Sequence, residues 1–407
     1  MEERAGADAG VADAALGLTP EERAHFFERG WIVKKGVMDV GTIRALADVV
    51  DAQVEETLNG LVARGDLAPE HTFPDEPFET RLGLAAHQLP SPEHKAALIN
   101  RFMGRAGADP LTPPTLPIIR HEPFRATLES ILGPVVIGGT DAPVRAKIPL
   151  DPLLAEENPG QCRTPWHQDA IFRTNTDCDS YLSVQCWIPL VDATIERGCL
   201  HFIPYRFEEG LLPHYHGGGF LGIHPSDMPN RAPVPVEAER GDVVLWHNMT
   251  PHASFFNRGD IVRWSMDWRF YGAEKPNNVD ELPTDHSEAG LPPSERTALA
   301  CSFPSADFVL LDRDHPEREC VDGQGMVRPS CPFGGCLLSG LIDGCGSAQV
   351  DARERFEQHR MGSEGYEAYI ASGSRPARWR PVKEHRQPGP GSDWAVAEDP
   401  REWQSKL

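Results

Sequence analysis

The residues with the clearest chemical potential lie between Thr164 and Asp169, in the sequence Thr-Pro-Trp-His-Gln-Asp. In an extended strand, side chains alternate between the two faces, so His167 and Asp169 project to the same side while Gln168 points away. An imidazole and a carboxylate then converge on one point. They supply two thirds of the 2-His-1-carboxylate facial triad, which holds Fe(II) and leaves coordination positions open. Because an H-x-D pair also arises by chance, a second feature is needed to support this interpretation.

The second feature is the stretch from Gly241 to Tyr271. A Gly-Asp turn opens an apolar, β-rich run, a turn of Asn, Arg, Gly and Asp follows, and the remainder is typical of a return strand. We expect these two strands to form a hairpin that brings Arg263 back beside His252. His252 then completes the triad. Arg263 offers a planar, bidentate grip on a carboxylate, which a lysine cannot reproduce.

These segments together resemble the phytanoyl-CoA dioxygenase family of iron(II)- and 2-oxoglutarate-dependent oxygenases. The resemblance covers roughly residues 18–272. It depends on the order and spacing of several short pieces, namely Trp166-His167-Gln168-Asp169, Gly198-Cys199-Leu200 followed by Ile203-Pro204, Gly241-Asp242, and His252 with Ser254, Asn257 and Arg263.

The resemblance implies a role for individual residues. The iron ligands are His167, Asp169 and His252, and Arg263 anchors the distal carboxylate of 2-oxoglutarate. The remaining candidates fall into two groups, cosubstrate-binding Ser254, Trp187 and Lys147, and substrate-binding Phe172, Gln185 and Arg269. Arg269 shares the strand parity of Arg263, which puts both on one face, but an ordinary ion pair would also explain it.

The activity implied by the resemblance uses Fe(II), 2-oxoglutarate as cosubstrate and O2. It oxidises an unactivated C–H bond of a substrate and releases succinate and CO2, with hydroxylation as the default outcome. The substrate is expected to be a small molecule, and the high usage of Ala, Arg, Gly and Pro hints at a natural product. The halogenase variant is disfavoured because it lacks the carboxylate that Asp169 provides. Desaturation, ring closure and epimerisation stay open. So do two other classes, a non-redox cupin-type metalloenzyme, which would not need Arg263, and a jelly-roll binding protein without activity.

The strands expected around these residues are short and separated by Pro, Gly and Asp turns. Residues 135–137, 144–148, 181–191 and 199–204 are each typical of a strand. In the third of these, Gln185 and Trp187 fall on one face. Many short strands after a helical start indicate a mainly β fold with flanking helices, whose core is a double-stranded β-helix of the jelly-roll or cupin-like type.

The expected helices precede these strands. Thr19 followed by Pro20 and Glu22 is typical of an N-cap, a first-turn proline and a capping box, so a short helix begins there. Residues 40–61 have apolar positions at helical spacing, and residues 94–102 and 123–132 are also predicted to be helical.

Composition limits the classes of partner. The 407 residues carry a formal net charge of -22, which disfavours nucleic acid and anionic membranes and favours a small-molecule substrate. No apolar run reaches the 18 or so residues of a membrane span, and the N-terminus has no signal-peptide pattern, so a cytoplasmic location is expected. Nine cysteines, an odd number, fit reduced thiols better than a disulfide framework. The oligomeric state does not follow from the sequence.

Other histidines compete for the metal role. His247 lies on the same predicted strand as His252, and only the set Ser254, Asn257 and Arg263, at family offsets from His252, favours the latter. Three further histidines lie in a predicted long loop, residues 207–234, without a matched carboxylate, namely His214, His216 and His224.

The chain is expected to comprise a flexible tail over residues 1–17, the oxygenase-like domain over residues 18–272, and an extension over residues 273–407 packed on that domain. The extension contains five cysteines, of which Cys331 and Cys336 are the closest pair. A structural zinc site needs four ligands, so loop thiols are favoured over zinc.

Overall fold

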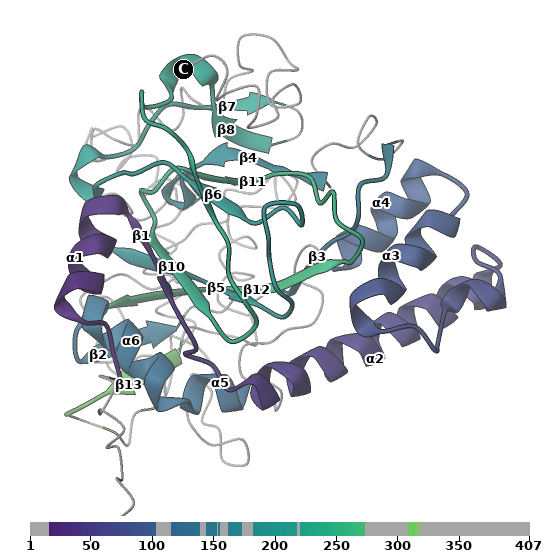
Figure 1. Ribbon diagram of the computed structural model, residues 1–407, viewed down its shortest axis with the longest axis horizontal. Helices are drawn as coiled ribbons and strands as arrows, with labels where there is room; N and C mark the ends of the chain where they lie inside the picture. Colours follow the sequence, from purple (N-terminus) through teal and green to yellow (C-terminus); the bar gives the residue numbers. More distant parts are fainter. Residues whose placement is uncertain are drawn as a thin grey trace, which may run out of the picture.

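The computed structural model describes residues 16–102, 115–138, 144–152, 154, 162–172, 182–217, 220–272, 308–314, 316 and 319. Figure 1 shows a β-rich centre with helices around it, as the sequence predicts. The helices are α1 (Pro20–Arg29), α2 (Val40–Arg64), α3 (Phe78–Gln88), α4 (Pro92–Arg101), α5 (Leu116–Arg120) and α6 (Glu122–Leu132).

The strands of the described residues form antiparallel sheets. The first half of the chain contributes β1 (Trp31–Lys34), β2 (Val135–Gly138), β3 (Val144–Lys147), β4 (Thr164–His167) and β5 (Ser183–Pro189). The second half contributes β6 (Leu200–Phe202), β7 (His214–Gly217), β8 (Phe220–Ile223), β9 (Val234–Val236), β10 (Val243–His247), β11 (His252–Ser254), β12 (Arg263–Gly272) and β13 (Phe308–Asp312).

Eight of these strands wind as a double-stranded β-helix. The larger sheet has the order β1-β10-β5-β12-β2-β13, with β3 also paired to β12, and the smaller sheet has the order β4-β11-β6-β9. From β3 to β12 the chain crosses between the two sheets at each step except from β6 to β9, leaving the separate β7-β8 hairpin aside. This winding is the jelly-roll arrangement, so the predicted core architecture is confirmed.

The predicted hairpin between His252 and Arg263 is wrong. The run after Gly241 divides into β10 and β11, which lie in different sheets, and β12 returns in the larger sheet beside β3 and β5. His252 and Arg263 therefore belong to opposite sheets of the barrel. The jelly-roll winding, which sends successive strands to alternate sheets, overrides the tendency of neighbouring strands to pair.

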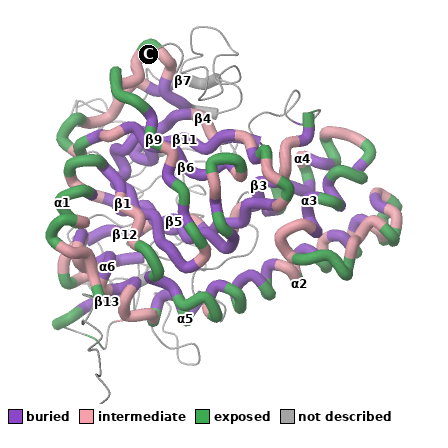
Figure 2. Tube along the Cα trace, in the orientation of Figure 1, coloured by how far each residue is buried: buried purple, intermediate pink, exposed green. Residues whose placement is uncertain are grey.

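The two faces of the larger sheet differ in chemistry. Outward-facing residues of β12 such as Trp264 and Met266 join the main apolar core together with residues from helices α1 to α6. That core covers the outer face of the sheet, and Figure 2 shows buried strands at the centre and exposed turns on the helices. The inward-facing positions of β12 alternate with these and are polar, namely Arg263, Ser265, Asp267 and Arg269. A polar interior indicates a functional site.

The predicted helix signals are confirmed at α1 and α2. Thr19 caps α1 and forms the expected capping box with Glu22, and Gly30 ends the helix in the left-handed conformation. The second helix runs from Val40 to Arg64, slightly longer than predicted, and its apolar stripe lies in the core. No helix among the described residues is long and apolar enough to traverse a bilayer.

The predicted loop over residues 207–234 is partly wrong. It contains the antiparallel β7-β8 hairpin, and β8 packs beside β4. Of the predicted C-terminal extension, β13 is described, and it pairs with β2 at the edge of the larger sheet. The cysteine pair at 331 and 336 lies outside the described residues, and the three domain boundaries stay predictions.

Two features of the structure require glycine at position 198, in the Gly198-Cys199-Leu200 segment that resembles the family. Its φ is +69°, and an added Cβ would lie 2.5 Å from the carbonyl oxygen of Phe255. Gly198→Ala is expected to lower the free energy of unfolding by about 2–4 kcal/mol, because backbone strain and a backbone clash add. Gly36, with φ of +61° and nothing within 4 Å of such a Cβ, is the control, for which alanine should cost about 1 kcal/mol. If denaturant unfolding shows that Gly198→Ala and Gly36→Ala lose the same free energy of unfolding, the predicted clash with Phe255 is contradicted.

Candidate metal centre

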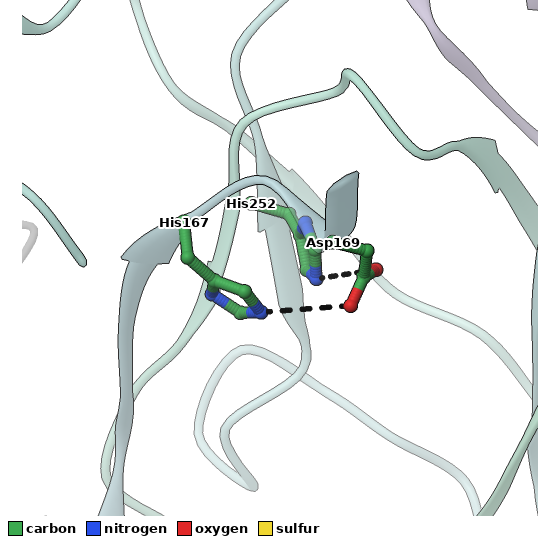
Figure 3. Close-up of side chains that lie close together, drawn as sticks. All are labelled: His167, Asp169 and His252. Atoms are coloured by element: carbon green, nitrogen blue, oxygen red, sulfur yellow. Dashed lines mark ion pairs between the residues drawn. The ribbon is translucent and has the colours of Figure 1, made fainter. Parts of the chain in front are cut away.

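Three buried side chains form a cluster inside the barrel. One potential ligand atom from each of His167, Asp169 and His252 lies within 4.8 Å of the others. Nε2 of His252 is 3.5 Å from Oδ2 of Asp169, and Nε2 of His167 is 4.0 Å from Oδ1. Figure 3 shows both imidazoles directing Nε2 toward the carboxylate. Among the described residues this is the one group of His, Cys, Asp and Glu side chains with such geometry.

The three residues are brought together by the smaller sheet. His167 ends β4 and is aligned with His252 of β11, so the two rings lie side by side with centroids 4.1 Å apart. Asp169 follows the strand and opens a short 3-10 turn. The prediction that His167 and Asp169 share a strand is therefore wrong for Asp169, and the turn directs its carboxylate back toward the rings.

Backbone carbonyls fix the tautomers of both histidines. Nδ1 of His167 lies 2.8 Å from the carbonyl oxygen of Pro165, and Nδ1 of His252 lies 3.0 Å from that of Thr250. A carbonyl oxygen can only accept, so each Nδ1 carries the proton and each Nε2 has a lone pair toward the cluster. Burial, reinforced by His252, lowers the pKa of His167 to about 3. His167 is thus in the neutral form that a metal ligand requires.

The carboxylate of Asp169 stays ionised. Burial acts to raise its pKa, but nearby His252 and Arg269, with His167 and a hydrogen bond from Trp246, together hold the pKa below its usual range. Arg269 Nη2 lies 3.5 Å from Oδ1, and Trp246 Nε1 donates to Oδ2 at 3.1 Å. Two imidazoles and one ionised carboxylate are therefore presented together, a donor set suited to a divalent transition metal.

Arg263 is a buried cation in the same interior. It is 4% exposed, and its Nη1 donates to Ser265 Oγ at 2.6 Å. Its Nε has no hydrogen-bond partner in the part of the chain that the structure describes. Burial lowers the pKa of Arg263 to about 10, so the guanidinium is still charged at neutral pH. A buried charge with unused donors is costly unless an anion pairs with it.

Lys147 lies beside Arg263, but unlike Arg263 Nε its Nζ has hydrogen-bond partners in the protein. The two residues are aligned on β3 and β12. Lys147 Nζ donates to Ser254 Oγ at 2.7 Å and to the carbonyl oxygens of Cys162, Ser254 and Phe255. Burial and the charge of Arg263 keep the pKa of Lys147 well below its ordinary value. These contacts give Lys147 a position next to the predicted cosubstrate pocket and tie β3 to β11.

The other predicted residues surround this interior. Trp187 lies under Arg263, whose guanidinium carbon is 5.2 Å from the ring centroid. Gln185 is buried and aligned with Arg269 on β12. Phe172 ends the turn that Asp169 opens, and its role in substrate binding stays a prediction.

His247 does not join the cluster. It is fully buried on the outer side of β10, where its ring packs edge-on against Phe26 of α1. Its Nε2 is 3.1 Å from the carbonyl oxygen of Tyr205, and its Nδ1 is 3.1 Å from Thr250 Oγ1. The structure thus separates the two competing histidines by sheet, and His252 is the one beside His167 and Asp169.

The burial of His247 predicts a pH dependence of stability. Burial lowers its pKa to about 4 from 6.5, so on acidification the unfolded chain takes up a proton before the folded chain does. The contribution is complete above pH 6.5 and is lost as the pH falls toward 4, by about 1.4 kcal/mol per pH unit. The free energy of unfolding, measured with urea at several pH values between 4 and 6.5, should fall less steeply with decreasing pH in His247→Gln than in wild type. An equal pH dependence in both proteins would contradict the lowered pKa of His247.

Gln168 and His214, to which the sequence assigned no supporting role, hold the turn that carries Asp169. The side chain of Gln168 donates to the carbonyl oxygens of Gly210 and Met249 and accepts from the backbone N–H of Leu212. Its backbone N–H donates to Nε2 of His214 at 3.0 Å. His214 therefore touches the segment between the two ligands without being a ligand. A residue in a predicted loop gives no signal of this contact, which depends on the β7-β8 hairpin.

Comparisons with known proteins point to the same region. The family model described as Phytanoyl-CoA dioxygenase (PhyH) matches residues 118–265. "Phytanoyl-CoA dioxygenase domain-containing protein 1" of Mus musculus is 36% identical over 105 residues, 24% of this chain and 35% of that protein. Its counterpart in Danio rerio is 30% identical over 121 residues, 28% of this chain and 40% of that protein. The matched region thus spans well under half the length of these curated relatives.

Solved structures of low identity also match. A non-heme monooxygenase, ThoJ in its apo form, is 18% identical with a TM-score of 0.42, covering 62% of this chain and 77% of that one. EvdO2 from Micromonospora carbonacea var. aurantiaca, complexed with 2-oxoglutarate, is 17% identical with a TM-score of 0.37, covering 62% and 90%. The resemblance of this chain to the phytanoyl-CoA dioxygenase family is confirmed by the family model over residues 118–265, the segment that contains His167, Asp169, His252 and Arg263.

Proposed function

We propose that this chain is an Fe(II)- and 2-oxoglutarate-dependent oxygenase that hydroxylates an unactivated C–H bond of a small molecule. The observation that carries the proposal is the cluster of His167, Asp169 and His252 in the same barrel interior as the buried guanidinium of Arg263. The match of the surrounding segment to the phytanoyl-CoA dioxygenase family supports it.

The residues present fit both groups by charge. A divalent iron, the carboxylate of Asp169 and the guanidinium groups of Arg263 and Arg269 leave a net positive charge, which favours binding of a 2-oxoglutarate dianion. Arg263 Nε lacks a partner within the described residues, and Asp267, four residues further along β12, is paired with Arg145. An incoming carboxylate can therefore take the free donors of Arg263 in a bidentate contact.

His167, Asp169 and His252 would hold the iron on one side and leave its other side open. With iron and 2-oxoglutarate bound, O2 would be the oxidant, taking two electrons from 2-oxoglutarate, which leaves as succinate and CO2, and two from the substrate C–H bond. The protein contributes orientation. Lys147 holds Ser254 in place two residues from His252, and the ring of Trp187 supports Arg263. The presence of Asp169 in the cluster favours hydroxylation over halogenation.

The test is product formation. Purified protein is incubated with mixtures of small metabolites, Fe(II), 2-oxoglutarate and air, and mass spectrometry follows succinate and any species that gains one oxygen atom. Succinate and an oxygenated product that both require iron and 2-oxoglutarate support the proposal. Tight metal binding without any response to 2-oxoglutarate would instead support a non-redox cupin-type enzyme. Absence of metal binding would support a binding protein.

A further inference from the structure

Trp246 contacts two of the three residues of the candidate metal centre. It projects from the inner face of β10, in the larger sheet, across the barrel toward the smaller one. Its indole Nε1 donates to Oδ2 of Asp169 at 3.1 Å, and its ring centroid lies 4.9 Å from that of His252. Only 5% of Trp246 is exposed, so water does not compete for this hydrogen bond.

The indole is held firmly in this position. Trp246 is aligned with Trp31 on β1 and with Gln185 on β5, so strands flank it on both sides. Its ring packs on Phe202, at a centroid distance of 5.5 Å, and Phe202 in turn stacks on both Trp31 and His252. The donor atom therefore has a fixed place relative to the cluster.

Asp169 needs such a partner more than the two histidines do. His167 and His252 lie on paired strands, and a backbone carbonyl fixes each ring. Asp169 lies on a turn after the strand end, where no sheet ladder restrains it. Of the two donors whose contacts with its carboxylate are given above, Trp246 is nearer, because Arg269 Nη2 is 3.5 Å from the other oxygen.

We propose that Trp246 is a positioning residue of the metal centre: its N–H fixes the orientation in which the Asp169 carboxylate meets the metal, and its ring supports the His252 imidazole. This inference rests on the proposed function, since it takes the cluster to be a metal centre. Partners that orient metal ligands in this way contribute strongly to metal affinity, although they do not touch the metal.

The test removes the donor and keeps the ring. Trp246→Phe retains an aromatic side chain for packing but cannot donate to Asp169. Co(II) and Mn(II) affinities are measured by calorimetry under anaerobic conditions, and the visible absorption of bound Co(II) reports the ligand geometry. We expect an affinity about tenfold weaker than wild type and an altered Co(II) spectrum. The thermal unfolding midpoint of the metal-free protein should fall, because a buried side chain becomes smaller and a hydrogen bond is lost, but the unfolding transition should stay cooperative.

Trp264→Phe is the matched control. Trp264 is fully buried on the outer face of β12, stacked on Phe78, and its indole nitrogen has no hydrogen-bond partner within the described chain. Its replacement should leave Co(II) affinity and spectrum unchanged. The inference is overturned if Trp246→Phe binds both metals as tightly as wild type with the same spectrum, or if Trp264→Phe weakens binding equally. Failure of the wild-type protein to bind any divalent metal would instead overturn the proposed function, and this inference with it.

Discussion

Replacing His252 with alanine is expected to weaken metal binding at least about 100-fold and to abolish succinate formation. His252 supplies one of the two imidazole rings of the cluster, and its Nε2 is already directed toward Asp169. The remaining pair, His167 and Asp169, cannot hold one face of a metal ion alone. Calorimetric titration with Mn(II), together with succinate measurement, checks both parts of the expectation.

His201→Ala is the control for this variant. His201 is a buried histidine of the same sheet, aligned with Ala253 and therefore on the face opposite to His252. Its removal should cost stability through lost packing on Phe255, whose ring centroid is 4.8 Å away, but should leave metal affinity intact. If His201→Ala loses metal as His252→Ala does, the loss reflects general damage to the barrel and the ligand assignment is contradicted.

Arg263→Leu has the second large expected effect, and it acts on the cosubstrate alone. Loss of a buried bidentate charge pair costs about 2–5 kcal/mol, so the affinity for 2-oxoglutarate should fall by roughly 30-fold to several thousand-fold. Mn(II) affinity should stay near the wild-type value, because Arg263 contacts no metal ligand. Binding of 2-oxoglutarate to the Mn(II)-loaded protein can be followed by calorimetry.

Arg263→Leu should also change the stability of the ligand-free protein in an unusual direction. Arg263 is buried, its Nε lacks a hydrogen-bond partner among the described residues, and burial already lowers its pKa. Leucine removes this desolvation cost, so the ligand-free variant should unfold at a temperature equal to or above that of wild type. A large drop in its unfolding temperature, or unchanged 2-oxoglutarate affinity, would contradict the role assigned to Arg263.

The local features of the fold could be predicted because they depend on local signals. The Thr19 cap, the apolar stripe of residues 40–61 and the alternation of Gln185 and Trp187 on β5 each reflect the periodicity or capping of one element. The pair His167 and Asp169 was found for the same reason, since residues two positions apart in an extended chain share a face. The turn at Asp169 achieves that proximity by a different route.

The long-range arrangement could not be predicted in the same way. The hairpin expected between His252 and Arg263 assumed that strands adjacent in sequence pair, whereas β11 pairs with β4 and β6 and β12 pairs with β3 and β5. The supporting contacts of Trp246 and His214 depend on which strands face one another across the barrel. The sequence therefore indicates the reactive side chains, and the fold determines the side chains that hold them.

The most direct test of the account is a crystal structure of the protein prepared anaerobically with Fe(II) and 2-oxoglutarate, with anomalous data collected at the iron edge. We expect one iron peak within bonding distance of Nε2 of His167, Nε2 of His252 and a carboxylate oxygen of Asp169, with the distal carboxylate of 2-oxoglutarate on the guanidinium of Arg263. An iron peak elsewhere, or 2-oxoglutarate bound away from Arg263, would contradict it.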